Sequence, residues 1–273
     1  MVIGGVWSAL ADAQVPGGAT RSLFGIALTG KAAALLEEVE QLFGHELREE
    51  LTDDPEGMSG RSKVDHDGVP TISVDRYHGK QIDVIVHELY HLKLRAQGYP
   101  TIFWLYPRGM NNAASRAGTA QLAAQVHDPI EHYLFYETVR SWGINPGETF
   151  EKHTAKMLAD DSLAALYRAM DDDAAALYYF KVRLEVADSP LLHNIQQALR
   201  SAGKESSIEF GEKLSELVID AKPNSPRKAM EATIDVLNMF YKGRFIFAQR
   251  PWITVQLGKN VQRRAQIQIV LWQ

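Results

Sequence analysis

The chain has 273 residues, of which 45% are hydrophobic and 23% charged, a balance typical of ordinary globular domains. Its formal net charge of −5, without a long basic run, gives no reason to expect nucleic acid as a partner, and no stretch approaches the ~18 apolar residues of a membrane span. The absence of cysteine excludes disulfides, thiolate metal sites and a cysteine nucleophile, which leaves histidine and carboxylate as metal ligands.

The first quarter of the chain is expected to supply packing elements. Residues 1–15 have a short apolar run but no positively charged start, so we expect a cytoplasmic protein. Helical periodicity predicts a helix over residues 31–51, with one apolar side made of Leu35, Leu36, Val39, Leu42 and Phe43. Polar residues, glycine and proline indicate a loop over 52–68. Alternation predicts a strand over 69–75, where Pro70 suits an edge or a strand start.

Residues 81–98 combine an apolar helical stripe with a reactive arrangement. His87 and His91 are four residues apart, so a helix projects both from one face, with Glu88 beside them. Two imidazole nitrogens at this spacing can both reach a tetrahedral zinc ion at about 2.0–2.1 Å. Glu88 is rotated by roughly 100° from His87, too far to reach the metal but well placed to hold its water as general base.

Beyond this helix, residues 99–118 contain several glycine, proline and asparagine residues and are expected to form a long irregular connection. Residues 119–142 regain helical spacing. Because proline is awkward inside a helix, Pro129 suggests that the productive part begins at about His127 or Asp128.

Three potential ligands lie within six residues of this second helix: His127, Glu131 and His132. His127 and Glu131 share a face, and any of the three can supply what a catalytic zinc site with only two histidines lacks. Geometry favours Glu131 as the third ligand. His132, rotated by roughly 100° from it, then suits a neighbouring role such as oxyanion donor, for which Tyr99, Tyr133 and Tyr136 are further candidates.

A strand, a helix bearing H-E-L-Y-H and a later helix bearing E-H resemble the gluzincin class of zinc metallopeptidases, and most closely its small, minigluzincin-like members. The resemblance covers roughly residues 69–140. It implies that His87, His91 and Glu131 hold Zn²⁺ and that Glu88 activates a zinc-bound water. In this class an edge strand pairs with an extended peptide substrate. The gap from His91 to Glu131 is longer than in most members, so His127 and His132 remain alternatives.

The second half of the chain reads as mostly helical. Amphipathic segments follow one another from residue 150 to 241, and Ser225 before Pro226 is typical of a helix N-cap. The acidic run at 171–173 is expected to be a solvated helix end. Alternation around a Gly-Lys-Asn turn at 258–260 predicts a terminal hairpin, which either extends the earlier sheet or stands apart.

These patterns predict an α+β fold: a mostly helical zincin-like core with a small antiparallel sheet and a C-terminal β-hairpin. We place the core at 1–145 and a helical extension at 146–273, packed with it as one unit. The expected function is a zinc-dependent metallopeptidase acting on a protein or peptide. The alternatives are a regulator or toxin-type protein that keeps such a fold for protein binding, and another zinc hydrolase. Glu88 favours the enzyme, since a purely structural zinc site needs no base.

Overall fold

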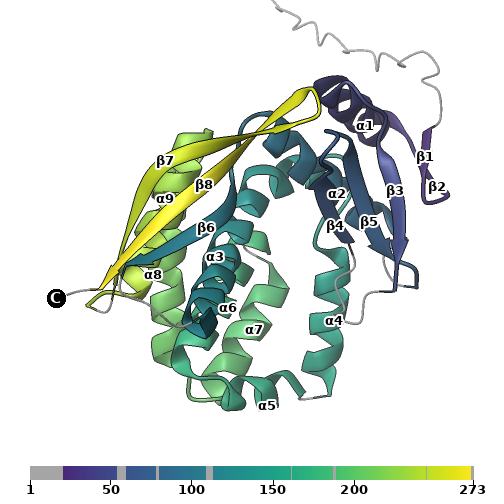
Figure 1. Ribbon diagram of the computed structural model, residues 1–273. Coiled ribbons are helices and arrows are strands. Elements are labelled where there is room, and N and C mark those ends of the chain that lie inside the picture. The colour runs from purple at the N-terminus through teal and green to yellow at the C-terminus, as the bar shows by residue number, and fades with distance from the viewer. Residues whose placement is uncertain are drawn as a thin grey trace, which may run out of the picture.

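The computed structural model describes residues 21–53, 60–77, 80–108, 113–160, 162–186, 189–243 and 245–271, and its fold is α+β, as predicted (Figure 1). The helices are α1 (Gly30–Phe43), α2 (Ile82–Ala96), α3 (Ala113–Arg140), α4 (Glu148–Ala159), α5 (Ser162–Ala169), α6 (Asp172–Glu185), α7 (Pro190–Ser201), α8 (Glu205–Ala221) and α9 (Pro226–Phe240). The strands are β1 (Arg21–Leu23), β2 (Ile26–Leu28), β3 (Arg48–Thr52), β4 (Gly60–Val64), β5 (Pro70–Asp75), β6 (Thr101–Arg108), β7 (Phe245–Leu257) and β8 (Asn260–Leu271). None of the helices described here is long and apolar enough to span a membrane.

The sheet beside α2 is mixed, with strand order β3-β5-β4. The predicted strand is β5, but it lies in the middle of this sheet and all six of its residues are buried, so the edge position was wrong. Pro70 is its first residue, where a missing N–H costs least. The expected antiparallel sheet is only half right, because β4 pairs antiparallel with β5 whereas β3 pairs parallel.

Both neighbours of β5 come from segments that the sequence patterns assigned otherwise. The helix expected to reach residue 51 ends at Phe43, because Gly44 adopts the left-handed conformation (φ 68°) and caps α1. After this cap the chain continues into the strand β3. The segment predicted as a loop contains β4, whose residues alternate in burial although they are mostly polar.

The helix α3 is longer than predicted. It runs from Ala113 through Pro129 to Arg140, so the expected start near His127 was wrong, and the supposed irregular connection contains β6 and the first turns of α3. A proline inside a helix leaves the carbonyl four residues earlier without its usual donor. Here that residue is Gln125, which is exposed to solvent, and burial of Val126 and Ile130 on either side of the proline holds the helix in place.

The predicted terminal hairpin is present as β7 and β8, and it does not extend the first sheet. It forms a second sheet of order β6-β8-β7, in which β6 pairs parallel with β8. In Figure 1 the yellow hairpin reaches from the helical half of the molecule to the end of α1. Its turn packs on Asp67 and Gly68, and the Asn260 side-chain amide donates hydrogen bonds to the carbonyls of Phe43 (2.9 Å) and Gly68 (3.0 Å).

The helical second half adjoins α3. Ser225 accepts a hydrogen bond from Lys228 N and caps α9, and Asp171 caps α6, so the acidic run is a helix end as expected. The helix α6 packs against both α3 and α8. The main hydrophobic core crosses residue 145, with fully buried members on both sides that include Leu36, Ile72, Leu89, Phe180, Leu214 and Val236. A smaller core joins helices α5 to α8.

Candidate metal centre

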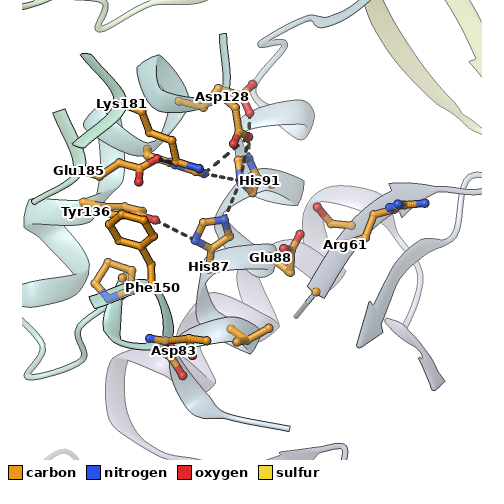
Figure 2. A pocket seen from close by; sticks show the side chains of 18 of the residues that line it. Arg61, Asp83, His87, Glu88, His91, Asp128, Tyr136, Phe150, Lys181 and Glu185 are labelled. Atoms are coloured by element: carbon orange, nitrogen blue, oxygen red, sulfur yellow. Dashed lines mark hydrogen bonds and ion pairs between the residues drawn. The ribbon is translucent and has the colours of Figure 1, made fainter. Parts of the chain in front are cut away.

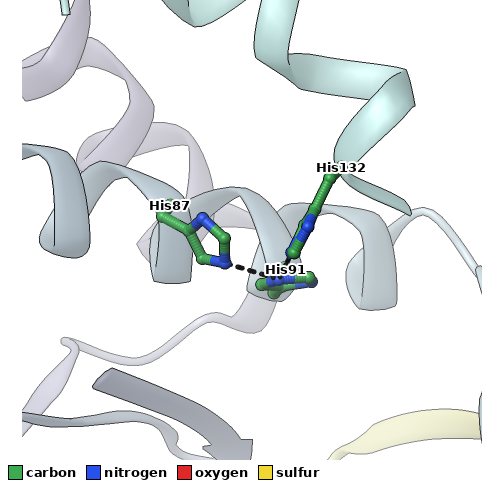
Figure 3. A group of neighbouring side chains, drawn as sticks. All are labelled: His87, His91 and His132. Atoms are coloured by element: carbon green, nitrogen blue, oxygen red, sulfur yellow. Dashed lines mark hydrogen bonds between the residues drawn. The ribbon is translucent and has the colours of Figure 1, made fainter. Parts of the chain in front are cut away.

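Three histidine side chains converge where α2 meets α3. Nε2 of His91 lies 3.1 Å from Nε2 of His87 and 3.2 Å from Nε2 of His132 (Figure 3). Tetrahedral zinc with nitrogen ligands at 2.0–2.1 Å would separate neighbouring nitrogens by about 3.3 Å, so the arrangement fits such an ion. These ligand atoms form one of two groups among the described residues that can hold a metal, the other being His91, Asp128 and Glu131.

The apolar side of α2 and an aromatic ring on α3 fix the histidine rings. Ile85, Leu89 and Leu92 have no exposed surface, which anchors α2 and leaves the face with the two histidines toward α3. The ring of Phe135 lies 5.5–5.8 Å from the centroids of all three imidazoles, edge to face with each. A buried ring therefore backs the whole group.

Each histidine is also held at its other nitrogen. His91 Nδ1 lies 2.8 Å from a carboxylate oxygen of Glu131, and His132 Nδ1 lies 2.5 Å from one of Glu185. His87 Nδ1 lies 3.3 Å from the hydroxyl of Tyr136. A partner at Nδ1 orients the ring so that Nε2 faces a metal, and this is the usual arrangement around bound zinc.

The structure places Glu131 and His132 differently from the sequence-based expectation. His132, expected as an oxyanion donor, lies with the two histidines of α2, whereas Glu131 lies on the far edge of the His91 ring. The second oxygen of Glu131 is 3.2 Å from His127 Nε2. His127 itself turns away from the group, with Nδ1 2.9 Å from the Thr233 hydroxyl on α9.

Burial and hydrogen bonding set the charges of His87 and Glu131. Burial holds the pKa of His87 well below its usual 6.5, and the nearby His132 and His91 lower it further. Burial alone would raise the pKa of Glu131, but hydrogen bonds from His127 and His91 outweigh it and hold that pKa well below 4.5. At neutral pH the site therefore contains a neutral ligand ring at His87 and a fixed negative charge at Glu131.

His132 is in a different electrostatic environment. Burial favours its neutral form, yet the carboxylates of Asp128 and Glu185 outweigh burial and raise the pKa of His132 above 6.5. Asp128 Oδ1 lies 3.6 Å from His132 Nε2 and 3.9 Å from His91 Nε2, and half of its side chain is exposed. A carboxylate thus approaches the converging nitrogens from the open side of the group.

Glu88 lies on the other side of the group, toward β4. It is 7% exposed and forms part of the wall of a cavity of about 680 Å³ that also includes the three histidines. Figure 2 shows Glu88 between His87 and Arg61. The backbone of Gly60 comes so close that a Cβ there would lie 3.1 Å from Cγ and 3.2 Å from Oε1 of Glu88. The glycine at the start of β4 therefore makes room for this carboxylate.

The rest of the cavity wall comes from segments far apart in the sequence. An edge strand, β4, contributes Gly60, Arg61 and Ser62, and the start of α4 is tied to α2 because the Thr149 hydroxyl donates to Asp83 (2.9 Å). Further wall residues, which the sequence patterns do not mark as site residues, are Asp128, His153, Lys181 and Glu185. Of the four suggested oxyanion donors, the described wall includes His132 and Tyr136 but neither Tyr99 nor Tyr133.

No signal in the sequence marks Glu185. It lies 53 residues after His132, at the end of α6, where buried apolar neighbours such as Phe180, Val182 and Leu184 indicate ordinary packing. Comparison with protein-family models, with curated proteins and with solved structures finds no match. The chemistry of the site therefore rests on its own geometry, which provides a buried group of histidines and carboxylates able to hold a metal ion.

Proposed function

We propose that this protein is a zinc-dependent peptidase. The observation that carries the proposal is the convergence of three histidine Nε2 atoms in a cavity whose wall also contains Glu88 and an edge strand. Two histidines and a glutamate on one helix, with a third ligand on another, is the minimum for holding zinc beside a base. The edge of β4 supplies backbone groups with which an extended peptide can pair.

We assign the three metal bonds to His87, His91 and His132. Nε2 of His91 lies at the spacing of tetrahedral ligands from Nε2 of His87 and of His132, and each ring is held at Nδ1 by another group. Glu131 then orients His91 instead of binding zinc itself. This assignment replaces the ligand set that the family resemblance implied, and it leaves the roles of His87, His91 and Glu88 as expected.

Zinc bound there would supply Lewis-acid chemistry, polarising a carbonyl group and lowering the pKa of water. Glu88 accepts a proton from the attacking water as the water oxygen bonds to the peptide carbonyl carbon. The same carboxylic acid then returns the proton to the amide nitrogen as the C–N bond breaks. The side chains of Tyr136, Glu131 and Glu185, each close to Nδ1 of one histidine, keep the three rings in place during both steps.

The first test is metal content. The purified protein should carry about one zinc per chain, and His87→Ala, His91→Ala or His132→Ala should each remove it. Glu131→Ala should keep the zinc with affinity lowered by about 10- to 100-fold, as for other groups that hold a ligand from behind. His153→Ala is the matched control, because this exposed histidine lies on the same cavity wall and should leave zinc content unchanged.

Two results would change the assignment. Loss of zinc in Glu131→Ala with retention in His132→Ala would make Glu131 the third ligand. Full retention of zinc in a His87→Ala, His91→Ala double variant would show that zinc does not bind at these histidines.

The second test separates chemistry from metal binding. Glu88→Gln preserves the shape of the side chain and should retain zinc, while hydrolysis of an unstructured protein mixture, followed by mass spectrometry, should fall by about 10²- to 10⁴-fold. If Glu88→Gln were as active as the wild type, Glu88 could not be the general base. A protein that only binds partners would show no hydrolysis in either form.

A further inference from the structure

A second cavity, of about 910 Å³, adjoins the metal cavity. The two share four wall residues, Arg95, Asp128, Glu131 and Lys181, so they meet at the Arg95 end of α2. Figure 2 shows Asp128 and Lys181 together on the far side of His91 from Glu88. Both side chains are partly exposed, with 50% for Asp128 and 40% for Lys181, so polar groups in contact with solvent lie at the junction.

The metal cavity has room on both sides of the histidines. Its wall follows α2 from Asp83 in the first turn to Arg95 in the last, and His87 and His91 lie between these ends. At the Asp83 end the wall continues into Gly147 and Phe150. At the Arg95 end it continues into the second cavity. A chain lying across the metal group can therefore extend in both directions.

Arg95 also limits how far a peptide can pair with β4. Its guanidinium donates to the carbonyl oxygen of Ser62 (2.8 Å) and to the Ser62 hydroxyl (3.0 Å). Since Ser62 belongs to the edge strand, a peptide that pairs along β4 from Gly60 meets the Arg95 side chain at Ser62. Arg95 also belongs to the wall of the second cavity, so that cavity adjoins this end of the strand.

One part of the wall of the second cavity suits apolar side chains. Away from the junction this part consists of Met170, Leu177, Tyr178, Phe240 and Tyr241, which lie just after α5, on α6 and at the end of α9, and it borders the carboxylates of Asp171 and Asp173. Its volume lies in the upper part of the range of about 300–1,000 Å³ that holds ligands the size of a few residues. Two exposed alanines, Ala124 on α3 and Ala174 on α6, also belong to the wall.

We propose that the second cavity is the continuation of the substrate cleft and that the enzyme is an endopeptidase. It would cleave an internal bond of a polypeptide that carries a bulky apolar side chain on the Arg95 side of the scissile bond. This inference rests on the proposed function and goes further in naming the kind of substrate. Binding energy gained in a remote subsite raises the rate at the reacting bond, so long substrates should be cleaved faster than short ones.

The test fills the second cavity without touching the metal group. Ala124→Trp and Ala174→Trp each place a large side chain in it, and Ala165→Trp on α5, an exposed position outside both described cavity walls, is the matched control. Quenched-fluorescence peptides are compared, a short one spanning the scissile bond and longer ones extended on either side in turn. Zinc content and circular dichroism check that each variant is folded and loaded.

We expect kcat/KM on one of the two extended series to fall by at least ~10-fold in both cavity variants, with the short peptide, the zinc content and the control unchanged. The extended peptide should also bind more weakly, by fluorescence anisotropy, when either tryptophan is added to the Glu88→Gln protein. If the ratio of kcat/KM for long and short substrates stayed unchanged in both cavity variants, the second cavity would not be part of the substrate cleft. The proposed peptidase activity would not be affected by that result. Release of only terminal residues by the wild type would overturn the endopeptidase assignment, and cleavage of no peptide at all would refute the proposed function itself.

Discussion

His132 differs from the two histidines of α2 in the charges around it. The carboxylates of Asp128 and Glu185 outweigh burial and raise the pKa of His132, whereas burial lowers that of His87. Zinc binds only the neutral imidazole. At pH 6.5 or just below, the metal-free site therefore holds His132 mostly in its protonated form, and zinc must displace that proton, while His87 is mostly in its neutral, metal-binding form.

This difference predicts proton release on zinc binding. At pH 6.5, the ordinary pKa of histidine, a raised pKa leaves the His132 ring more than half protonated, so zinc should release more than half a proton from it. The apparent zinc affinity should weaken as the pH falls further, because protons then compete more strongly. Titration calorimetry in buffers of different ionisation enthalpy counts the protons. Binding with no net proton release at pH 6.5 would show that His132 is not the protonated ligand.

At the scale of single residues, the sequence predicted the motif but not the groups that hold it. The spacing of His87 and His91 is enough to place both on one helical face, and it marks Glu88 as base. Glu131 and His132 are adjacent, and the side that faces α2 depends on the rotation of α3, which a pattern of apolar residues fixes only approximately. Glu185 could not be found, because it reaches the site through the packing of α6 on α3.

At the scale of elements, the sequence patterns did not predict the short strands that consist mostly of polar residues. β4 contains glycine, serine, arginine and lysine, which favour a loop, yet its antiparallel pairing with β5 makes it a strand. Its position matters because Gly60 packs against Glu88. The helix α2 was predicted almost to its ends, since its apolar stripe carries its own period.

The approach of Gly60 to α2 gives a testable consequence. In Gly60→Ala the new Cβ would lie 2.7 Å from Cγ1 of Val84 as well as 3.1 Å from Cγ of Glu88, so β4 must move away from α2, or the Val84 and Glu88 side chains must both shift. A misplaced base lowers the rate strongly, and we expect hydrolysis to fall by about 10- to 100-fold with zinc content unchanged.

The double variant Gly60→Ala, Val84→Ala serves as control, because it relieves the tighter contact with Val84 and leaves the one with Glu88. Compared with Val84→Ala alone, the double variant should lose little further stability, because the new Cβ takes the place of the removed methyl groups, while its activity should stay low. Wild-type activity in Gly60→Ala would mean that the position of Glu88 does not depend on this glycine.

At the scale of the whole molecule, the sequence located the C-terminal hairpin but not its surroundings. β8 pairs with β6, which precedes it by more than 150 residues, and nothing local marks such a partner. The main core likewise joins residues on both sides of position 145. Lys181 and Glu185 come from the later part and reach the metal cavity, so the two parts of the chain meet at the site.

The turn of the hairpin gives the last prediction. Gly258 adopts a left-handed conformation (φ +56°), and a Cβ there would lie 1.8 Å from the carbonyl oxygen of Asp67, so no side chain fits without separating the hairpin from the first sheet. Gly44 has a similar φ of +68° but nothing within 4 Å of its Cβ position. Both Gly44→Ala and Gly258→Ala should cost about 1–2 kcal/mol of backbone strain, and Gly258→Ala should lose about 1–3 kcal/mol more from the collision. Urea unfolding of the two variants measures the difference. An equal loss in both would show that the hairpin turn does not pack on Asp67 and Gly68. A larger loss in Gly258→Ala with zinc affinity preserved would show that this contact stabilises the fold without affecting the metal site.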